Sequence, residues 1–240
     1  MVEGSEKFFA WDPSIDLFPM EVVKKFFFIV IRRYGFVNCS GKFVIKPKFQ
    51  KAKPFSEGLA PVKVGNLWGF INKNGNFVIE PSFDDTGVFS NGLARVLLGG
   101  KWGYINPSGK FVINPEFDEA RDFSEELAAV RVGGKWGYIN RVGSFVVMPK
   151  FDWAGNFSEG MGVVEIHSKY GFTNKAGKLL IKPRFEDACD FSEGFARVKE
   201  KGKWGIIDET GEYVIEPQVE GQVTLSSLRI VLARKFRNYS

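Results

Sequence analysis

Residues 99–130 read GGKWGYINPSGKFVINPEFDEARDFSEELAAV, and near copies of this stretch recur along the chain. When the 240 residues are set in rows of 34, they align without a gap. One column holds an aromatic residue followed by Gly, at Tyr34, Trp68, Trp102, Trp136, Tyr170 and Trp204. Further columns hold Asn, Gly, Pro and Phe. Chance cannot produce so many matching columns, so the chain contains six tandem repeats.

Each repeat has the residue chemistry of β-strands. Helical repeats can also have a 34-residue period, but every unit here has an internal Pro and at least two Gly, which break helices. In the quoted unit, residues 93–98, 102–106 and 110–113 are rich in Phe, Val and Ile and are separated by turns. The sequence predicts three strands per unit, with a short fourth strand after Phe117. It also predicts that Pro115 ends strand pairing.

The alternation of side chains assigns faces to these strands. Both faces of the second and third strands are apolar, which predicts sheets stacked between neighbouring units. The first strand is predicted to turn one column toward solvent, namely Pro61, Arg95, Ala129, Val163 and Arg197. The Gly after each aromatic residue is expected to let a ring pack closely against the backbone.

The fold class is all-β. We favour an open, β-solenoid-like stack of six three-stranded units over the alternative, a six-bladed β-propeller. Propeller blades usually need about 40 residues. A first-strand segment also occurs seven times, once at residues 26–30 before the first unit and once at 228–230 after the last. The repeat array is predicted over residues 25–220, with a capping segment at 1–24 and a capping strand with a basic tail at 221–240.

These residues resemble the WG-repeat family, also described as the KWG repeat of bacterial proteins. The resemblance covers residues 25–217, about four fifths of the chain. It implies a bacterial repeat protein that acts as an interaction module without a general catalytic activity. The sequence departs from the family pattern at Tyr34 and Tyr170, which replace Trp, and at Glu126, which replaces Gly.

Composition and charge limit the classes of partner and location. Hydrophobic residues are 44% and charged residues 25%, as in a soluble globular protein. The net charge is +5, but residues 221–240 hold four basic residues and no acid, so the repeat body is nearly neutral. No nucleic-acid partner is therefore expected.

The strongest apolar run, residues 26–31, is too short to span a membrane. No signal peptide is visible, and Cys39 and Cys189 are not equivalent in the repeat, which favours a reducing, cytoplasmic location.

The polar columns are given structural interpretations. One acid per unit, at Asp84, Asp118, Asp152 and Glu186, predicts a bond to a loop rather than a catalytic pair. The recurring Ser, at Ser56, Ser158 and Ser192, is expected to bond nearby backbone within its turn. No cluster of His, Cys and carboxylate has metal-ligand spacing. No catalytic residue, cofactor or metal is expected.

Function in repeat arrays is expected where one copy departs from the others on the surface. Trp153 occupies a column that is charged in other copies, Val163 stands in the solvent-facing column, and His167 replaces a turn Gly nearby. Trp is a frequent anchor of interfaces. We expect a non-catalytic scaffold that binds another protein through a patch containing these three residues. Trp153 could instead merely cover a neighbouring side chain. The alternative function is a multivalent glycan-binding or cell-surface-binding module that uses the aromatic and Asn columns.

Overall fold

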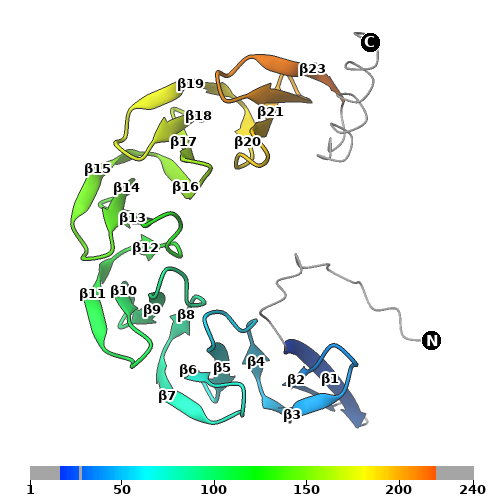
Figure 1. Ribbon diagram of the computed structural model, residues 1–240. Coiled ribbons are helices and arrows are strands. Elements are labelled where there is room, and N and C mark those ends of the chain that lie inside the picture. Colours follow the sequence, from blue (N-terminus) through cyan, green and yellow to red (C-terminus); the bar gives the residue numbers. More distant parts are fainter. Residues whose placement is uncertain (1–16, 27–28, 220–240) are drawn as a thin grey trace. The chain divides into compact units, whose positions relative to one another are not determined.

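The computed structural model describes residues 17–26 and 29–219. All regular secondary structure in this part of the chain is β-strand, in six antiparallel sheets that follow one another along the sequence (Figure 1). Within the same residues, no helix is long and apolar enough to cross a membrane. The chain divides into two compact units, Met1–Glu116 and Phe117–Ser240.

The first unit holds one three-stranded sheet and two four-stranded sheets. The first sheet pairs β1 (Phe18–Phe26), β2 (Ile29–Val37) and β3 (Phe43–Phe49). The second pairs β4 (Lys51–Ala52), β5 (Ala60–Val64), β6 (Leu67–Ile71) and β7 (Phe77–Phe83). The third pairs β8 (Asp85–Thr86), β9 (Ala94–Leu98), β10 (Lys101–Ile105) and β11 (Phe111–Phe117), so its last residue begins the second unit.

The second unit holds three four-stranded sheets. One pairs β12 (Glu119–Ala120), β13 (Leu127–Val132), β14 (Lys135–Asn140) and β15 (Phe145–Phe151). The next pairs β16 (Trp153–Ser158), β17 (Met161–Ile166), β18 (Lys169–Asn174) and β19 (Leu179–Phe185). The last pairs β20 (Asp187–Ala188), β21 (Phe195–Glu200), β22 (Lys203–Asp208) and β23 (Tyr213–Val219).

The tandem all-β prediction is confirmed, with one refinement of the unit. The linking stretch after each conserved Phe supplies a fourth strand, as Asp85 and Thr86 do by pairing with Leu97 and Val96. Each four-stranded sheet therefore begins inside the preceding repeat. Every sheet uses consecutive strands, and none of the six joins strands from both ends of the described chain. The described residues thus form an open series of sheets.

Each third strand continues through its Pro, so the prediction that Pro ends strand pairing is wrong. In the second sheet Trp68 pairs with Phe83 and Phe70 pairs with Ile79, which leaves three residues of β7 opposite one residue of β6. Pro81 lies inside this β-bulge. Because bulged residues do not join the hydrogen-bond ladder, the missing N–H of Pro leaves no partner unsatisfied.

The Gly after each aromatic residue lies directly against this bulge. A Cβ atom on Gly69 would be 2.6 Å from the carbonyl oxygen of Ile79 and 2.7 Å from the nitrogen of Pro81. The same approach, at 2.4 to 2.7 Å from the matching carbonyl oxygen, occurs at Gly35, Gly103, Gly137, Gly171 and Gly205. The expected close approach is confirmed, but the group that approaches is the backbone of the following strand and not an aromatic ring.

Aromatic pairs join successive sheets within each unit. The ring centroids of Phe70 and Phe89 are 5.0 Å apart, and Phe83 meets Phe111 edge-on at 6.2 Å. Pairs equivalent to Phe70 and Phe89 occur in the second unit, where the ring centroids of Tyr138 and Phe157 are 4.7 Å apart and those of Phe172 and Phe191 are 4.8 Å apart. These pairs account for the regular Phe columns. A single sheet cannot bury its own apolar faces, so neighbouring sheets do so.

In the first-strand column predicted to face solvent, Pro61, Ala129 and Val163 are buried, and Arg95 and Arg197 are half-buried. Ala129 lies in a core cluster shared by the β12–β15 and β16–β19 sheets, and Val163 lies in one shared by the last two sheets. Arg95 places its guanidinium 4.9 Å from the centroid of the Trp102 ring. The prediction was wrong at Ala129 and Val163 because a further sheet packs against the face that these residues occupy.

The first sheet begins earlier than the sequence suggested. Strand β1 pairs with β2 from Phe18 opposite Val37 to Phe26 opposite Ile29. The segment 26–30 is therefore not the first strand, because β1 ends and β2 begins within it. Part of the predicted N-terminal cap, from residue 18 onward, is the edge strand of this sheet. The predicted capping strand and basic tail at 221–240 lie outside the described residues.

Replacing Gly69 by Ala should strongly destabilise the first unit. The new methyl group would collide with backbone atoms of the bulge, and shifting the backbone costs about 2–4 kcal/mol of unfolding free energy. Urea denaturation measures this loss. Val78→Ala, at an exposed position of β7 in the same sheet, is the matched control. Equal, small effects of the two variants would contradict the role assigned to the Gly.

Candidate functional site

The repeated acids hold the hairpin turns, as predicted. The backbone N–H of Gly99 donates to Asp84 Oδ2 at 3.0 Å, and that of Gly133 donates to Asp118 Oδ2 at 3.0 Å. In the last two sheets the corresponding bonds run from His167 N to Asp152 Oδ2 at 2.7 Å and from Gly202 N to Glu186 Oε2 at 2.9 Å. Each acid thus fixes the turn of its own sheet, which is a structural role.

The repeated Ser joins neighbouring repeats, and the prediction of a bond within its own turn is wrong for the hydroxyl group. The Ser56 hydroxyl donates to the carbonyl oxygen of Phe89 at 2.6 Å, and Ser158 donates to that of Phe191 at 2.8 Å. The residue after Ser56, Glu57, accepts a hydrogen bond from the N–H of Gly92 at 3.0 Å. These loops are therefore tied to the next repeat.

The Asn column organises the second turn of each unit. Asn106 Oδ1 accepts hydrogen bonds from the backbone N–H groups of Ser108 at 3.1 Å and Lys110 at 3.0 Å. Equivalent pairs of bonds occur at Asn38, Asn72, Asn140, Asn174 and Asp208. The side-chain oxygen is occupied by the turn in every copy.

Trp153 lies at the start of β16 and is half-buried. The Arg121 guanidinium is 4.6 Å from its ring centroid, and the ring of Tyr170 meets it edge-on at 6.0 Å. The indole covers Gly155, where a Cβ atom would be 3.2 Å from the ring. The ring also packs against the core cluster between the last two sheets. These contacts favour the interpretation of Trp153 as a packing residue, and its contact with a partner stays a prediction.

The other two residues of the predicted patch differ sharply in exposure. Val163 is 1% exposed in the core of the second unit, so it offers no surface to a partner. His167 is exposed on the β17–β18 hairpin with φ at 51°, and Ser168 has φ at 58°. Two successive positive φ angles define the tight turn that joins short antiparallel strands. The structure therefore places His167 on the surface as a turn residue.

A different departure from the repeat stands out on β15 and the turn before it. Val142 is 74% exposed and Met148 is 67% exposed, and Phe145 and Val146 beside them are exposed as well. The positions equivalent to Met148 hold Lys46, Glu80, Asn114, Lys182 and Glu216. Those equivalent to Val142 hold Ser40, Asn74, Ser108, Ala176 and Thr210. Phe145 points to the other face of β15, where its ring packs against Phe117. We call Val142, Val146 and Met148 the β15 patch.

Sequence reasoning missed the β15 patch although its signal was present. Met148 is apolar in a column that is otherwise charged or polar, which is the criterion that singled out Trp153. The prediction that strand pairing ends at the Pro left residue 148 next to an expected strand end, where its orientation was not assigned. The bulge keeps it within β15, an edge strand of its sheet.

The recurring geometry of Gly, bulge, acid and Asn agrees with the comparison of families. The family described as the WG containing repeat matches residues 34–68, 68–102, 102–136, 136–170, 170–204 and 204–221. The chain belongs to the WG-repeat family. The name refers to the aromatic residue and the Gly that lies against the bulge.

Solved structures show likeness to this WG-repeat chain in fold alone. Kluyveromyces lactis Hsv2 has a TM-score of 0.52 and 10% identity, over 81% of this chain and 79% of that one. A form of KlHsv2 with loop 6CD replaced by a Gly-Ser linker has a TM-score of 0.48 and 10% identity, over 76% and 74% of the two chains. The extracellular domain of a putative hybrid two-component system from B. thetaiotaomicron has a TM-score of 0.47 and 11% identity, over 78% and 32%. No curated protein matches the sequence.

The four Trp residues of the WG pairs do not present open stacking faces. Trp68 and Trp136 are buried, and Trp102 and Trp204 are half-buried with an Arg side chain over each ring. Sugar rings bind proteins by stacking on exposed aromatic faces, and these four rings do not supply such a face. The Asn side-chain oxygens, which could accept hydrogen bonds from sugar hydroxyls, are already bonded within their turns. The described geometry therefore does not favour glycan binding through these two columns.

Replacing Trp153 by Ala should reduce stability. Removing a half-buried ring that packs on Gly155, Tyr170 and Arg121 is expected to lower the unfolding free energy by about 2 kcal/mol. Chemical denaturation of the variant and the wild type measures the difference. An unchanged denaturation midpoint would contradict the packing role and would favour contact with a partner as the role of Trp153.

The Asp152 carboxylate should make stability depend on acid pH. Hydrogen bonds from the Lys135 ammonium and the His167 backbone hold the pKa of Asp152 below its usual range. The unfolded pKa is about 3.9, so the stabilisation is present above pH 4 and is lost as the pH falls through the lower folded value. Asp152→Asn should melt slightly below wild type at pH 7, and the gap should close toward pH 2.5. A gap that stays constant with pH would be incompatible with this account.

Proposed function

We propose that this WG-repeat chain is a non-catalytic scaffold that binds another protein through the β15 patch. The observation that carries the proposal is the exposure of Val142 and Met148 at positions where the five sibling repeats mostly have polar or charged residues. Exposed apolar clusters are costly in water and mark interaction surfaces in many proteins. Met is enriched at interfaces because its side chain adapts to a partner's shape.

The surroundings of the β15 patch suit recognition by side chains. Arg141 pairs with Glu126 at 3.5 Å beside the turn, and Lys150 donates to the carbonyl oxygen of Gly177 at 3.0 Å. Arg141 and Lys150 flank the β15 patch in sequence, and a polar rim beside an apolar centre is the usual anatomy of an interface. Pro149 and the bulge interrupt the free edge of β15, so a partner strand could not extend the sheet there.

The proposal changes the residues expected to contact the partner but keeps the class of function. Repeat β-folds are generally interaction modules, and none of the described acids, serines or the single His forms a catalytic arrangement in the contacts above. No group of three metal-binding side chains lies close enough within the described residues to hold an ion. His167 remains a predicted contact residue on a separate hairpin turn.

A double variant that introduces the polar residues found at the equivalent positions of other repeats tests the proposal. Val142→Ser with Met148→Asn should remove at least one stoichiometric protein from a pull-down, because the apolar centre of the surface is lost. The melting temperature should stay within about 2 °C of wild type, since both side chains are mostly exposed. Mass spectrometry of the captured proteins is the readout.

Val112→Asn is the matched control for this experiment. Val112 occupies the same repeat position as Val146 and is similarly exposed, but it belongs to β11 and not to the β15 patch. The control should capture the same proteins as wild type. If the double variant also captures the same proteins in the same amounts, the β15 patch is not the binding surface.

A further inference from the structure

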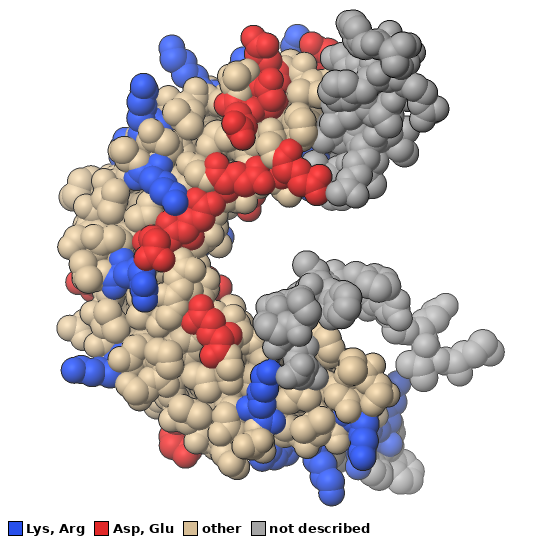
Figure 2. All heavy atoms as spheres, in the orientation of Figure 1, with Lys and Arg blue, Asp and Glu red and all other residues tan. Residues whose placement is uncertain are grey.

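The first sheet carries the largest excess of positive charge among the six described sheets. Residues 18–49 contain seven Lys or Arg and a single acid, Glu21, and all seven basic side chains are exposed. Figure 2 shows these basic side chains gathered over β1, β2 and β3. The remaining described residues, 50–219, are close to neutral, with 21 basic and 22 acidic groups. The basic character of the described chain therefore belongs to one sheet.

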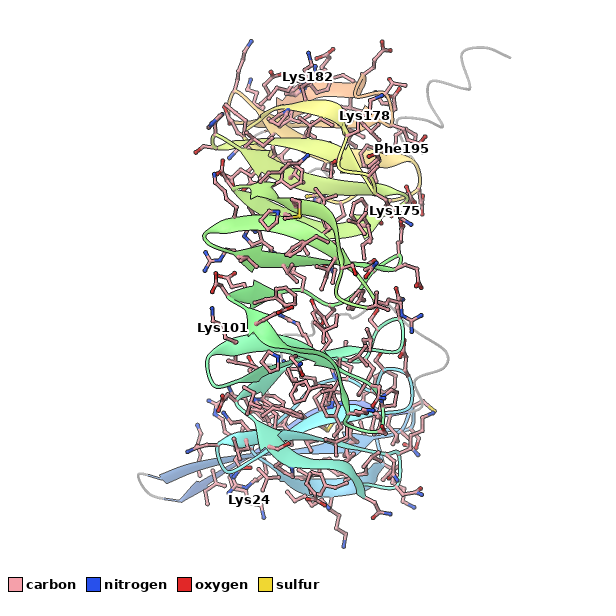
Figure 3. The ribbon with its side chains drawn as sticks, turned by 90° about the vertical axis from the view of Figure 1, so that its left-hand side faces the viewer. Lys24, Lys101, Lys175, Lys178, Lys182 and Phe195 are labelled. Carbon is pink, nitrogen blue, oxygen red and sulfur yellow. The ribbon has the colours of Figure 1, made fainter. Side chains whose placement is uncertain are left out.

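The β1–β2 hairpin is longer than the hairpins of the other sheets. The pair Val22 and Arg33 is equivalent to Val132 and Lys135, after which the β13–β14 hairpin turns. Strands β1 and β2 continue for four further residue pairs, ending at Phe26 opposite Ile29. At about 3.3 Å per residue this adds roughly 13 Å of paired strand. Figure 3 shows the hairpin, near the label of Lys24, extending beyond the other hairpins of the first unit.

The extension alternates cations with exposed apolar side chains. Lys24, Lys25, Arg32 and Arg33 are exposed, and Val23 and Ile31 between them are 43% and 39% exposed. Arg32 pairs with Glu21 at 3.2 Å. Neither Lys24 nor Lys25 has an acidic partner among the described residues. Residues 27 and 28, which connect the strands, lie outside the described part and are not used in the argument.

A hollow of about 550 Å³ opens on the outer face of this sheet. Its floor is apolar, formed by Val22, Ile31 and Pro47, and its cations are Lys24, Arg33 and Lys46, which come from three different strands. A ligand that matches these walls has a negatively charged group joined to apolar material. A phospholipid has this chemistry, with an anionic headgroup above an acyl chain.

We infer that the β1–β2 hairpin and its outer face bind the surface of an anionic lipid bilayer. The cations Lys24, Arg33 and Lys46, which line this face, contact the headgroups, and Ile31 and Val22 enter the boundary between headgroups and acyl chains. The negative surface potential of an anionic leaflet attracts the cations, and the apolar side chains beside them gain by leaving water. The hairpin lies at the surface and does not span the bilayer. This inference is independent of the proposed function, because the β15 patch is in the other unit.

The apolar side chains favour a bilayer over a nucleic acid. A nucleic-acid surface would use the same cations on phosphates but would gain nothing from exposed Ile31, since it offers no hydrocarbon phase. The contribution of Ile31 to binding therefore distinguishes a lipid bilayer from a nucleic acid as the partner. Its substitution should weaken binding to vesicles and leave binding to duplex DNA or heparin unchanged.

Sedimentation with lipid vesicles tests the inference. The full chain should bind vesicles that contain phosphatidylserine, should not bind pure phosphatidylcholine vesicles, and should bind less as salt rises. Each basic side chain near an anionic surface contributes about fivefold in partitioning. Lys24→Gln with Lys46→Gln should therefore weaken binding roughly 30-fold, and Ile31→Ser should weaken it on vesicles alone.

Lys178→Gln with Lys182→Gln is the matched control, because these two lysines are exposed on the second unit (Figure 3). The control should bind vesicles as wild type does, and circular dichroism should show that all variants are folded. Three results would overturn the inference. They are no binding of wild type to anionic vesicles, an equal loss in the control, or an Ile31→Ser effect that is the same on vesicles and on DNA.

Discussion

The contact between Gly69 and the bulged backbone at Pro81, repeated in all six sheets, is the constraint on which the rest of the fold depends. The second and third strands can pair across the bulge only because no side chain stands between them. The bulge bends the third strand, accommodates a Pro that has no N–H to donate, and interrupts the free edge of the sheet. The Gly of the WG pair is therefore required because any side chain at this position would collide with the bulged backbone.

Stacking of the sheets determines which residues remain available to other molecules. Ring pairs such as Phe70 with Phe89 and bonds such as Ser56 to the Phe89 carbonyl oxygen join residues that are 19 and 33 positions apart in sequence. Each sheet buries its faces against its neighbours in this way. Surface chemistry is then confined to the hairpins, the loops and the outer strands. A residue that departs from its column is informative only if it lies at one of these places.

The two surfaces proposed for binding differ in chemistry as well as in position. The β15 patch is apolar and its nearby charges are engaged in bonds, which suits a folded protein partner. The first sheet combines exposed cations with apolar side chains, which suits an anionic lipid surface. A chain with both surfaces could hold a protein at a membrane through separate units, since each unit has its own core clusters.

The sequence by itself determined the repeat, its period, the all-β class and the role of the acids that hold the turns. These features follow from local rules, because strand propensity, turn residues and a bond to a nearby turn act within one repeat. Only the tertiary structure decided that Val163 is buried, that Trp153 packs into a core and that Met148 is exposed. Those outcomes depend on which sheet lies against which face and on where a bulge shifts the register. Neither is visible in one repeat, because burial is a property of neighbouring sheets and not of a residue's own strand.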